Sequence, residues 1–522
     1  MSDESQASDI AALAKGGRTN FIGFLLRLIA RMPFLFISGR LYGAEALGRF
    51  ASALVVVELA AQLCTLGQKR GLAQKLAEEP AHPANDVADA LLLGGVLAIA
   101  VSLFLYAFPQ AIFPGGNITF LDRMVVLSIL PSTLTEIALA ALAFRFDIAA
   151  TVRARAVVEP WTLSITAGLF YLADQSALLG PDTDAGVFDA KASGLLIAFN
   201  LSMFAAAIAA LWPLFNSYGR PRNWRPNVKH IGGIAAANLP LALADAVEWG
   251  TRRFDIFILR FFAGDAAVGI YYVAQQIASL PQKLKTSFEP ILGPVITRNL
   301  RERNYSAIAK QVCQVGFWIT AMQAGIALAI GITGEGWMGL VGPRFVYGNG
   351  GLVFLLIAEV LAATAVVSEA ALIYVARMQN LAVSLITLAV QALATVGLML
   401  LVDRLGYNDM YRAAMAGAGL MIALGTASLI KSRLLARILG QSINNWRWPL
   451  IWAAFPAALV GWASTRYLPE WAELAFGAPA TLATYGFIIW HWGFGPEDRM
   501  LFRKSALPEL GPGADDNADN GP

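Results

Sequence analysis

The sequence predicts an all-α, polytopic membrane protein of about 14 transmembrane helices, with two pseudo-symmetric six-helix lobes followed by two C-terminal helices. Of the 522 residues, 57% are hydrophobic and only 14% are charged, and the mean hydropathy is +0.57. A soluble protein of this length would have about a quarter of its residues charged. The apolar runs are continuous instead of alternating, which favours helices over a β-barrel.

The basic residues predict the orientation of these helices. The expected spans are residues 20–40, 46–68, 88–112, 120–146, 154–174, 191–216, 232–262, 266–283, 311–341, 351–377, 380–402, 411–438, 449–467 and 474–492. With the N-terminus inside, 26 of the 39 Lys and Arg fall in inner segments, 9 fall in outer segments, and the others lie within helices. This bias predicts cytoplasmic termini, and it explains the basic residues without nucleic-acid binding.

Changes in composition divide the chain into six parts. They are a polar N-terminal tail (1–19), an N-lobe of helices 1–6 (20–216), a basic cytoplasmic linker (217–231), a C-lobe of helices 7–12 (232–440), the Trp-rich helices 13–14 (441–495) and a disordered cytoplasmic tail (496–522). The N-terminal tail is acidic and no cleavage site follows it, so we expect the first helix to be retained.

A short hinge sequence occurs twice, once in each half. Residues 43–48 and 264–269 both read Gly, four residues, Gly. The helix before the first hinge carries Arg27 and Arg31, and the helix before the second carries Arg252 and Arg253. A duplicated half with charges near the interface is typical of secondary transporters.

The helix expected at 232–262 holds the most informative charges. Its charged residues Asp245, Glu248, Arg252 and Asp255 are spaced by 3, 4 and 3 positions, which places all four on one helix face. Such a stripe faces either a wet cavity or a partner helix in a salt-bridge ladder. The cavity is favoured because Arg27 and Arg31 form a second stripe, although these two could instead extend to the membrane surface.

Further acids lie at span depth: Glu58, Glu136, Glu359 and Glu369. Each could bind a coupling cation or proton, and for any one of them alone, pairing with an arginine is the favoured interpretation. The chain has no nucleotide-binding Gly-rich loop and no connecting segment long enough for a catalytic domain. Its two cysteines and three histidines show no ligand spacing, so we expect neither catalytic residues nor a metal site. With a nucleotide-driven pump and a membrane enzyme disfavoured in this way, the sequence predicts a secondary transporter.

Three stretches near the N-terminus carry a resemblance to a known family. They are Asn20-x-x-Gly23-x-x-x-Arg27, Gly-Ala-Glu-Ala-Leu-Gly-Arg-Phe at 43–50 and Thr-Leu-Gly-Gln-Lys-Arg-Gly at 65–71. Together they resemble the opening of the polysaccharide-transporter family of oligosaccharide flippases. That family belongs to the multidrug/oligosaccharidyl-lipid/polysaccharide exporter superfamily, with multidrug extruders and the lipid II flippase. The motif covers about residues 16–75, while the layout of helices 1–12 also agrees.

The resemblance implies a flippase for undecaprenyl-diphosphate-linked oligosaccharides in the bacterial inner membrane, serving O-antigen or exopolysaccharide biosynthesis by alternating access. The substrate-binding residues would be Arg27, Arg31, Arg252 and Arg253. The acids that tune them and accept a coupling ion would be Glu58, Asp245, Glu248 and Asp255. The only cofactor implied is that ion, H⁺ or Na⁺. Besides the substrate and membrane lipids, the implied partners are the polysaccharide polymerase and the chain-length machinery.

Alternatives from other classes stay open. An ion-coupled multidrug or lipid exporter of the same superfamily would have a more acidic cavity with fewer arginines. A membrane glycosyltransferase or polymerase would be an enzyme with a long outer loop, and a scaffold would not need charges at depth. The acids beside the arginines also leave neutral or mixed sugar units open.

Overall fold

The structure is a computed structural model that describes residues 32–78, 82–114, 118–145, 147–175, 190–286, 296–496 and 498–499. All regular structure in these ranges is helical, which confirms the all-α class. Eleven helices in the described ranges are long and apolar enough to cross a membrane. Two further helices, α11 (Asp265–Thr286) and α18 (Trp448–Tyr467), contain 22 and 20 residues. The first expected span, 20–40, is described only from Met32.

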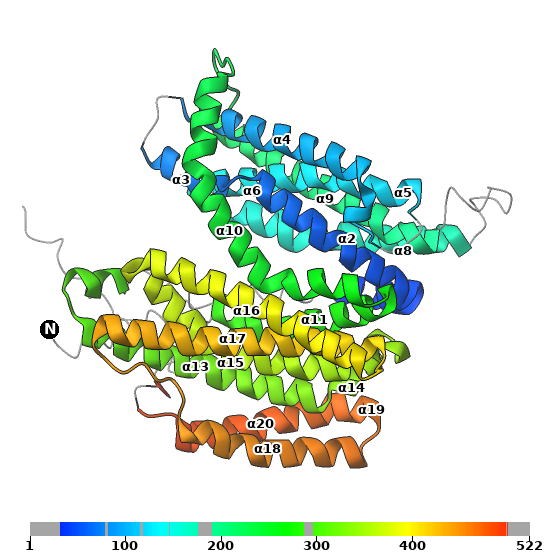
Figure 1. The fold of residues 1–522 in the computed structure, drawn as a ribbon, viewed down its shortest axis with the longest axis vertical. Helices are drawn as coiled ribbons and strands as arrows, with labels where there is room; N and C mark the ends of the chain where they lie inside the picture. The colour runs from blue at the N-terminus through cyan, green and yellow to red at the C-terminus, as the bar shows by residue number, and fades with distance from the viewer. Residues whose placement is uncertain are drawn as a thin grey trace, which may run out of the picture.

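The helices form three groups along the long axis of the molecule (Figure 1). The first group contains α2 (Gly43–Cys64), α3 (Gln68–Ala77), α4 (Pro83–Ala107), α5 (Phe120–Arg123), α6 (Ile129–Phe144), α7 (Ile148–Thr151), α8 (Glu159–Gln175) and α9 (Ala190–Tyr218). The second contains α10 (Val228–Phe262), α11, α13 (Tyr305–Ile332), α14 (Gly334–Val341), α15 (Asn349–Val375), α16 (Arg377–Arg404) and α17 (Asp409–Leu439). The third contains α18, α19 (Glu470–Ala472) and α20 (Ala478–Ile488).

The first and second groups meet mainly through α2 and α11. Their side chains share one apolar core, in which the Phe50 ring contacts Tyr272 edge-on with ring centroids 6.1 Å apart. Closest approach occurs at Gly48 and Gly269, the second glycines of the two repeated hinge sequences. Glycine allows this because it has no side chain to keep the helix backbones apart.

Helix α10 connects the two groups, and Figure 1 shows it running beside the first group, from the end near α3 and α4 down to the second group. It is 35 residues long and contains Pro240, which removes one backbone donor and permits a bend. Its contacts reach α3 and α2 of the first group and α16 and α17 of the second. Charges on α10 can therefore pair with residues of both groups.

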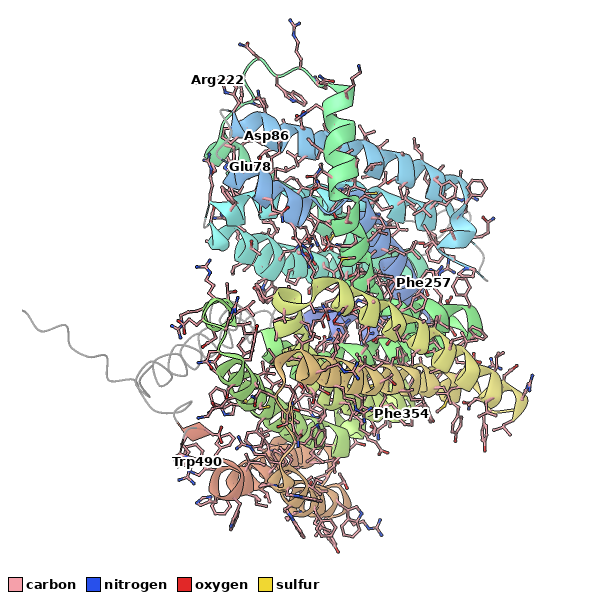
Figure 2. The ribbon with its side chains drawn as sticks, turned by 60° about the vertical axis from the view of Figure 1, so that its left-hand side comes forward. Glu78, Asp86, Arg222, Phe257, Phe354 and Trp490 are labelled. Carbon is pink, nitrogen blue, oxygen red and sulfur yellow. The ribbon has the colours of Figure 1, made fainter. Side chains whose placement is uncertain are left out.

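The connection from α9 to α10 folds back onto the start of α4. Asn85 and Arg222 exchange two hydrogen bonds of 3.1 Å through the Arg222 backbone, and the Trp224 indole donates to Asp89 at 2.8 Å. Figure 2 shows Asp86 and Arg222 near one end of the long axis, Phe257 between, and Trp490 near the other end.

The third group is anchored to α13 by a buried carboxylate. Asp498, near the start of the tail that the sequence predicts to be disordered from residue 496, is 2% exposed. It accepts hydrogen bonds from the Trp318 indole at 2.8 Å, Gly495 N–H at 2.9 Å and Arg447 at 2.6 Å. Burial by itself raises the pKa of Asp498, but these three donors outweigh it and the pKa is lowered. Residues 500–522 lie outside the described part of the chain.

Candidate functional site

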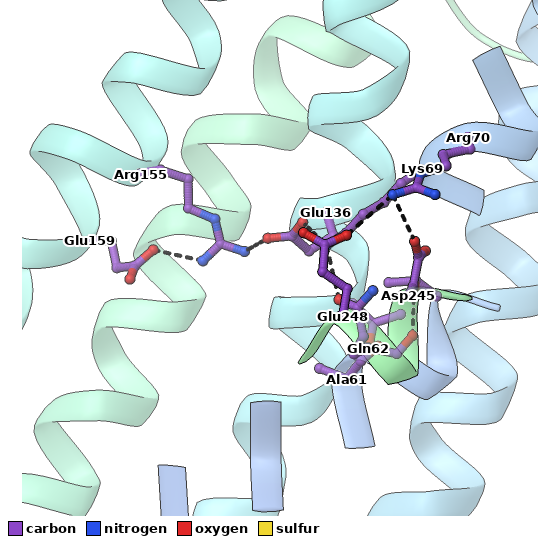
Figure 3. A network of polar contacts seen from close by, with 11 residues as sticks. Ala61, Gln62, Lys69, Arg70, Glu136, Arg155, Glu159, Asp245 and Glu248 are labelled. Atoms are coloured by element: carbon purple, nitrogen blue, oxygen red, sulfur yellow. Dashed lines mark hydrogen bonds and ion pairs between the residues drawn. The ribbon is translucent and has the colours of Figure 1, made fainter. Parts of the chain in front are cut away.

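A network of charged side chains lies where α3, α6 and α10 meet, as Figure 3 shows. On the side of the first group it is a chain of ion pairs. Glu159 pairs with Arg155 at 2.6 Å, and Arg155 also pairs with Glu136. Glu136 then pairs with Lys69 at 2.7 Å. Each basic group along this chain is shared between polar partners, so no member of the chain is a lone charge at membrane depth.

A tight turn places the basic residues of α3 against α10. Leu66 (φ 46°) and Gly67 (φ 68°) both adopt the left-handed conformation, which ends α2 and redirects the chain into α3. A Cβ on Gly67 would lie 2.7 Å from the Leu241 Cβ and 2.8 Å from the Ala242 nitrogen. Glycine is therefore needed here both for the turn and for the close contact with α10.

Arg70 of α3 connects the first group to α10. It lies 3.2 Å from Glu248 and 3.5 Å from Asp245. The second carboxylate oxygen of Glu248 accepts from Arg252 at 3.4 Å, so Glu248 lies between two arginines from different helices. The Asp245 side chain is 5% exposed, whereas the side chains of Arg70 and Glu248 are 50% and 54% exposed.

A second set of polar contacts joins α10 to α2 and α11. Arg253 pairs with Glu58 at 3.2 Å and donates to the Gln275 amide oxygen at 2.9 Å. Asp255 is fully buried and accepts from the Tyr271 hydroxyl at 2.6 Å and from the Gln275 amide. Within the described ranges, the side-chain hydrogen bonds of Asp255 come from the neutral groups of Tyr271 and Gln275, and a buried carboxylate held in this way is a place where a proton or a small cation could be held.

The structure brings most of the expected site residues together. Asp245, Glu248 and Arg252 share one network, and Glu58 joins Arg253. Asp255 is turned towards α11 instead of sharing the contacts of the other three residues of the stripe. Arg27 and Arg31 lie outside the described residues.

The sequence analysis does not identify several members of the network as site residues. It includes Lys69, Arg70 and Arg155 only among the basic residues of the inner segments. The signal that could have found Arg155 is its spacing of four residues from Glu159. For Lys69 and Arg70 it is their position directly after the Gly67 turn. Gln275 and Tyr271 gave no sequence signal, since a lone polar residue in an apolar helix is common.

The charges of the network nearly balance. In the described ranges the basic members are Lys69, Arg70, Arg155, Arg252 and Arg253, and the acidic members are Glu58, Glu136, Glu159, Asp245, Glu248 and Asp255. A bound anion must therefore replace a carboxylate as the ion-pair partner of an arginine. A bound cation must likewise replace a basic group as the partner of a carboxylate.

One group with metal-compatible spacing occurs in the described ranges, at the start of α10. It consists of Asp86, Asp89 and His230, which come from α4 and α10 and so are distant in sequence. Lys75 already lies 2.5 Å from Asp86 and 3.1 Å from His230 Nε2. The amine fills the position that an ion would need, so this group acts as an ion-pair contact between helices.

The opposite end of α10 holds a buried arginine. Arg260 is 8% exposed. It donates to the carbonyl oxygens of Ala111 at 2.5 Å and Ile112 at 3.2 Å, and its guanidinium lies 4.7 Å from the ring centroids of Phe257 and Phe261. A cavity of ≈ 140 Å³ lies beside it. Arg260 thus joins the second group to the segment after α4.

Comparisons with known proteins agree with this architecture. No protein-family model matches the chain, and no curated protein matches its sequence at a significant level. Solved structures do match. An inward-facing multidrug resistance MATE family transporter of the MOP superfamily has a TM-score of 0.62 at 15% identity, covering 80% of this chain and 99% of its own. Lipid II flippase MurJ, in an inward closed conformation, has a TM-score of 0.65 at 12% identity, covering 92% of this chain and 97% of its own.

A MOP superfamily transporter from Pyrococcus furiosus, described by the reverse polarity of its binding pocket, has a TM-score of 0.55 at 15% identity. The match covers 83% of this chain and 96% of that one. Identities this low establish the fold and leave the substrate open. The chain therefore has the fold of the MOP superfamily transporters and is a multi-pass membrane protein.

Proposed function

We propose that this chain is a flippase that moves undecaprenyl-diphosphate-linked oligosaccharides across the bacterial inner membrane for O-antigen or exopolysaccharide biosynthesis. The observation that carries the proposal is that Arg70 from α3 and Arg252 from α10 pair with the same acid, Glu248, across the two main helix groups. Arg253, next to Arg252 in the sequence, pairs with Glu58 of α2. A diphosphate with attached sugars is anionic and hydrophilic, and guanidinium groups match its oxygens in pairs. Arg27 and Arg31 would add to the same site.

The extent of the structural matches also supports a lipid flippase. The match with the multidrug transporter includes 99% of that transporter and 80% of this chain. The lipid II flippase covers 92% of this chain with nearly all of its own length. A larger share of this chain therefore has a structural counterpart in the flippase, and this likeness of fold agrees with the proposal.

Several accompanying features belong to the same proposal. Both termini would be cytoplasmic, because most Lys and Arg then lie inside. Rearrangement of the two helix groups would expose the network alternately to each side, as in other repeat-built transporters. The lipid tail would stay in the bilayer, and the polymerase and chain-length machinery would use the delivered units. The chain would transport and not catalyse.

Ion-coupled export of drugs or other lipids is the second candidate. The excess of one acid over the basic groups of the described network and the buried Asp255 favour it, because a cationic substrate is stabilised where acids outnumber basic groups. In either case Asp255, with Tyr271 and Gln275, is our candidate for holding a coupling proton or sodium ion.

Deletion in the native host separates the two candidates. We expect loss of surface polysaccharide, with undecaprenyl-linked repeat units accumulating on the inner leaflet and restored export on complementation. Unchanged polysaccharide with increased sensitivity to cationic drugs would support the exporter instead. Unpolymerised units that reach the outer leaflet would indicate a polymerase, and the proposal would then be wrong.

A further inference from the structure

We infer that Glu248 is a resident counter-ion, which the diphosphate of the substrate displaces from Arg70 and Arg252. These two arginines then form the diphosphate site, one from each main helix group. The inference rests on the proposed function and adds to it the residue Arg70 and an exchange of anions. Its basis is that one carboxylate oxygen of Glu248 lies 3.2 Å from Arg70 and the other 3.4 Å from Arg252.

The exposure of these three side chains makes the exchange possible. Glu248 is 54% exposed, Arg70 is 50% exposed and Arg252 is 38% exposed, so a ligand can reach all of them. Arg155 and Arg253 are each 22% exposed. A site for a displacing anion is therefore best placed on the two accessible arginines that share one acid.

Among the described residues, the guanidinium group of Arg252 has fewer polar partners than that of Arg70, Arg155 or Arg253. Arg155 lies between Glu136 and Glu159, and Arg253 binds both Glu58 and Gln275. Arg252, in contrast, has Glu248 as its one ion-pair partner among the residues that the structure describes. Losing Glu248 therefore frees Arg252 for a ligand, while Arg70 keeps a contact of 3.5 Å with the buried Asp245.

The chemistry favours a diphosphate over the resident carboxylate. Glu248 carries one negative charge and offers one oxygen to each arginine, at distances longer than the about 2.7–2.9 Å typical of charge-assisted bonds. A diphosphate diester carries two negative charges and has enough oxygens for paired bonds to each guanidinium. When the ligand leaves, Glu248 pairs again with both arginines. The return lowers the free-energy cost of release, so the substrate is bound firmly enough to be selected and weakly enough to be released.

The test is Glu248→Gln in the full chain, reconstituted in nanodiscs at low ionic strength and titrated calorimetrically with inorganic pyrophosphate. We expect pyrophosphate to bind roughly tenfold more tightly than to the unchanged chain, because the competing charge is gone. Transport of the lipid-linked oligosaccharide should be slower, because release is no longer assisted. The double variant Glu248→Gln/Arg70→Ala should lose the gain in affinity, which a merely structural role of Glu248 would not produce.

Asp403→Asn is the matched control. It removes one negative charge from an exposed carboxylate that pairs with an arginine, Arg412, outside the network, so pyrophosphate affinity should change less than about twofold. Equal or weaker pyrophosphate binding in Glu248→Gln, when the unchanged chain binds, would overturn the role of Glu248 and leave the flippase proposal standing. If neither the unchanged chain nor any variant binds pyrophosphate, both the inference and the diphosphate substrate are wrong.

Discussion

Gly48 of α2 and Gly269 of α11 pack backbone against backbone in a reciprocal contact. A Cβ on Gly48 would lie 1.7 Å from the Asp265 carbonyl oxygen, and a Cβ on Gly269 would lie 2.1 Å from the Ala44 carbonyl oxygen. Asp265 precedes Gly269 by four residues, as Ala44 precedes Gly48. The two repeated hinge sequences are thus related by a local two-fold axis, and their glycines fix the distance between the main helix groups.

Substitution of either glycine should weaken this contact. In Gly48→Ala the new methyl group meets backbone, which cannot rotate away, so α2 and α11 must separate; we expect a loss of about 1–3 kcal/mol. Gly269→Ala should have the same effect. The double variant should lose less free energy of unfolding than the two single variants added together, because separation of α2 and α11 by the first methyl group makes room for the second. Thermal unfolding in detergent measures the effect.

Gly95→Ala serves as the control, because a Cβ there meets only ordinary contacts at 3.8 and 3.9 Å. An unchanged melting temperature in Gly48→Ala, alongside an unchanged control, would mean that α2 and α11 do not approach as closely as described.

Arg252→Ala and Arg70→Ala should each abolish transport while leaving the protein in the membrane. Each variant removes one of the two guanidinium groups that an anionic headgroup would bind, and both side chains are exposed enough to be replaced without a cavity. Arg27→Ala should act in the same way. Polysaccharide export in a complemented deletion strain, with membrane levels checked by immunoblot, is the measurement.

Arg222→Ala is the comparison for these variants. Arg222 is also exposed and basic, but its two hydrogen bonds with Asn85 use its backbone, which alanine retains. Export should stay normal in this variant. Normal export in both Arg27→Ala and Arg252→Ala would instead remove the arginines from the transport pathway.

The sequence predicts much of the fold because few backbone structures are stable inside a bilayer. A continuous apolar run of about 20 residues must be a helix there, since no other segment satisfies its own backbone hydrogen bonds. The repeated glycine spacing also indicated a duplication, and the contact of Gly48 with Gly269 gives that repeat a physical role. Composition alone does not define every helix, because α11 contains polar residues such as Gln275 and is not among the eleven described helices that are long and apolar enough to cross a membrane.

The site was only partly predictable. Asp245, Glu248 and Arg252 follow from helical spacing and from the cost of charge in a membrane. Arg70 does not, because a basic residue near an inner helix end already satisfies the positive-inside rule. Its role depends on the left-handed turn at Gly67, which directs α3 onto α10, and such tertiary contacts have no signal in a single sequence.

Arg260 should control how tightly the two main helix groups are joined near the cavity beside it. Arg260→Met keeps most of the apolar stem but removes the donors to Ala111 and Ile112. We expect looser packing there, so a cysteine introduced as Ser52→Cys, at a residue that lines the cavity, should react several-fold faster with a polar thiol reagent. The native Cys64 and Cys313 should first be replaced by serine or alanine. Equal labelling rates with Arg and Met at position 260 would show that Arg260 does not join the groups.

Asp498 predicts a pH dependence for the attachment of α18–α20. Its pKa is lowered in the folded chain relative to about 3.9 when unfolded, because the donors outweigh the effect of burial. The folded state therefore binds the proton less readily, so the added stability is fully present above pH ~4 and is lost as pH falls through the lower folded pKa.

Asp498→Asn should lower the melting temperature at pH 7, since a charge-assisted bond to Arg447 is lost, at a cost of about 1–3 kcal/mol. The difference between variant and parent should shrink as the pH is taken below 4, where the parent carboxyl becomes protonated as well. Asp403→Asn is a suitable comparison, because that carboxylate is 56% exposed and its ion pair with Arg412 should contribute little. If the difference in melting temperature between Asp498→Asn and the parent stays constant from pH 7 to pH 3, the negative charge of Asp498 does not contribute to stability. Its packing and neutral hydrogen bonds would then account for the effect.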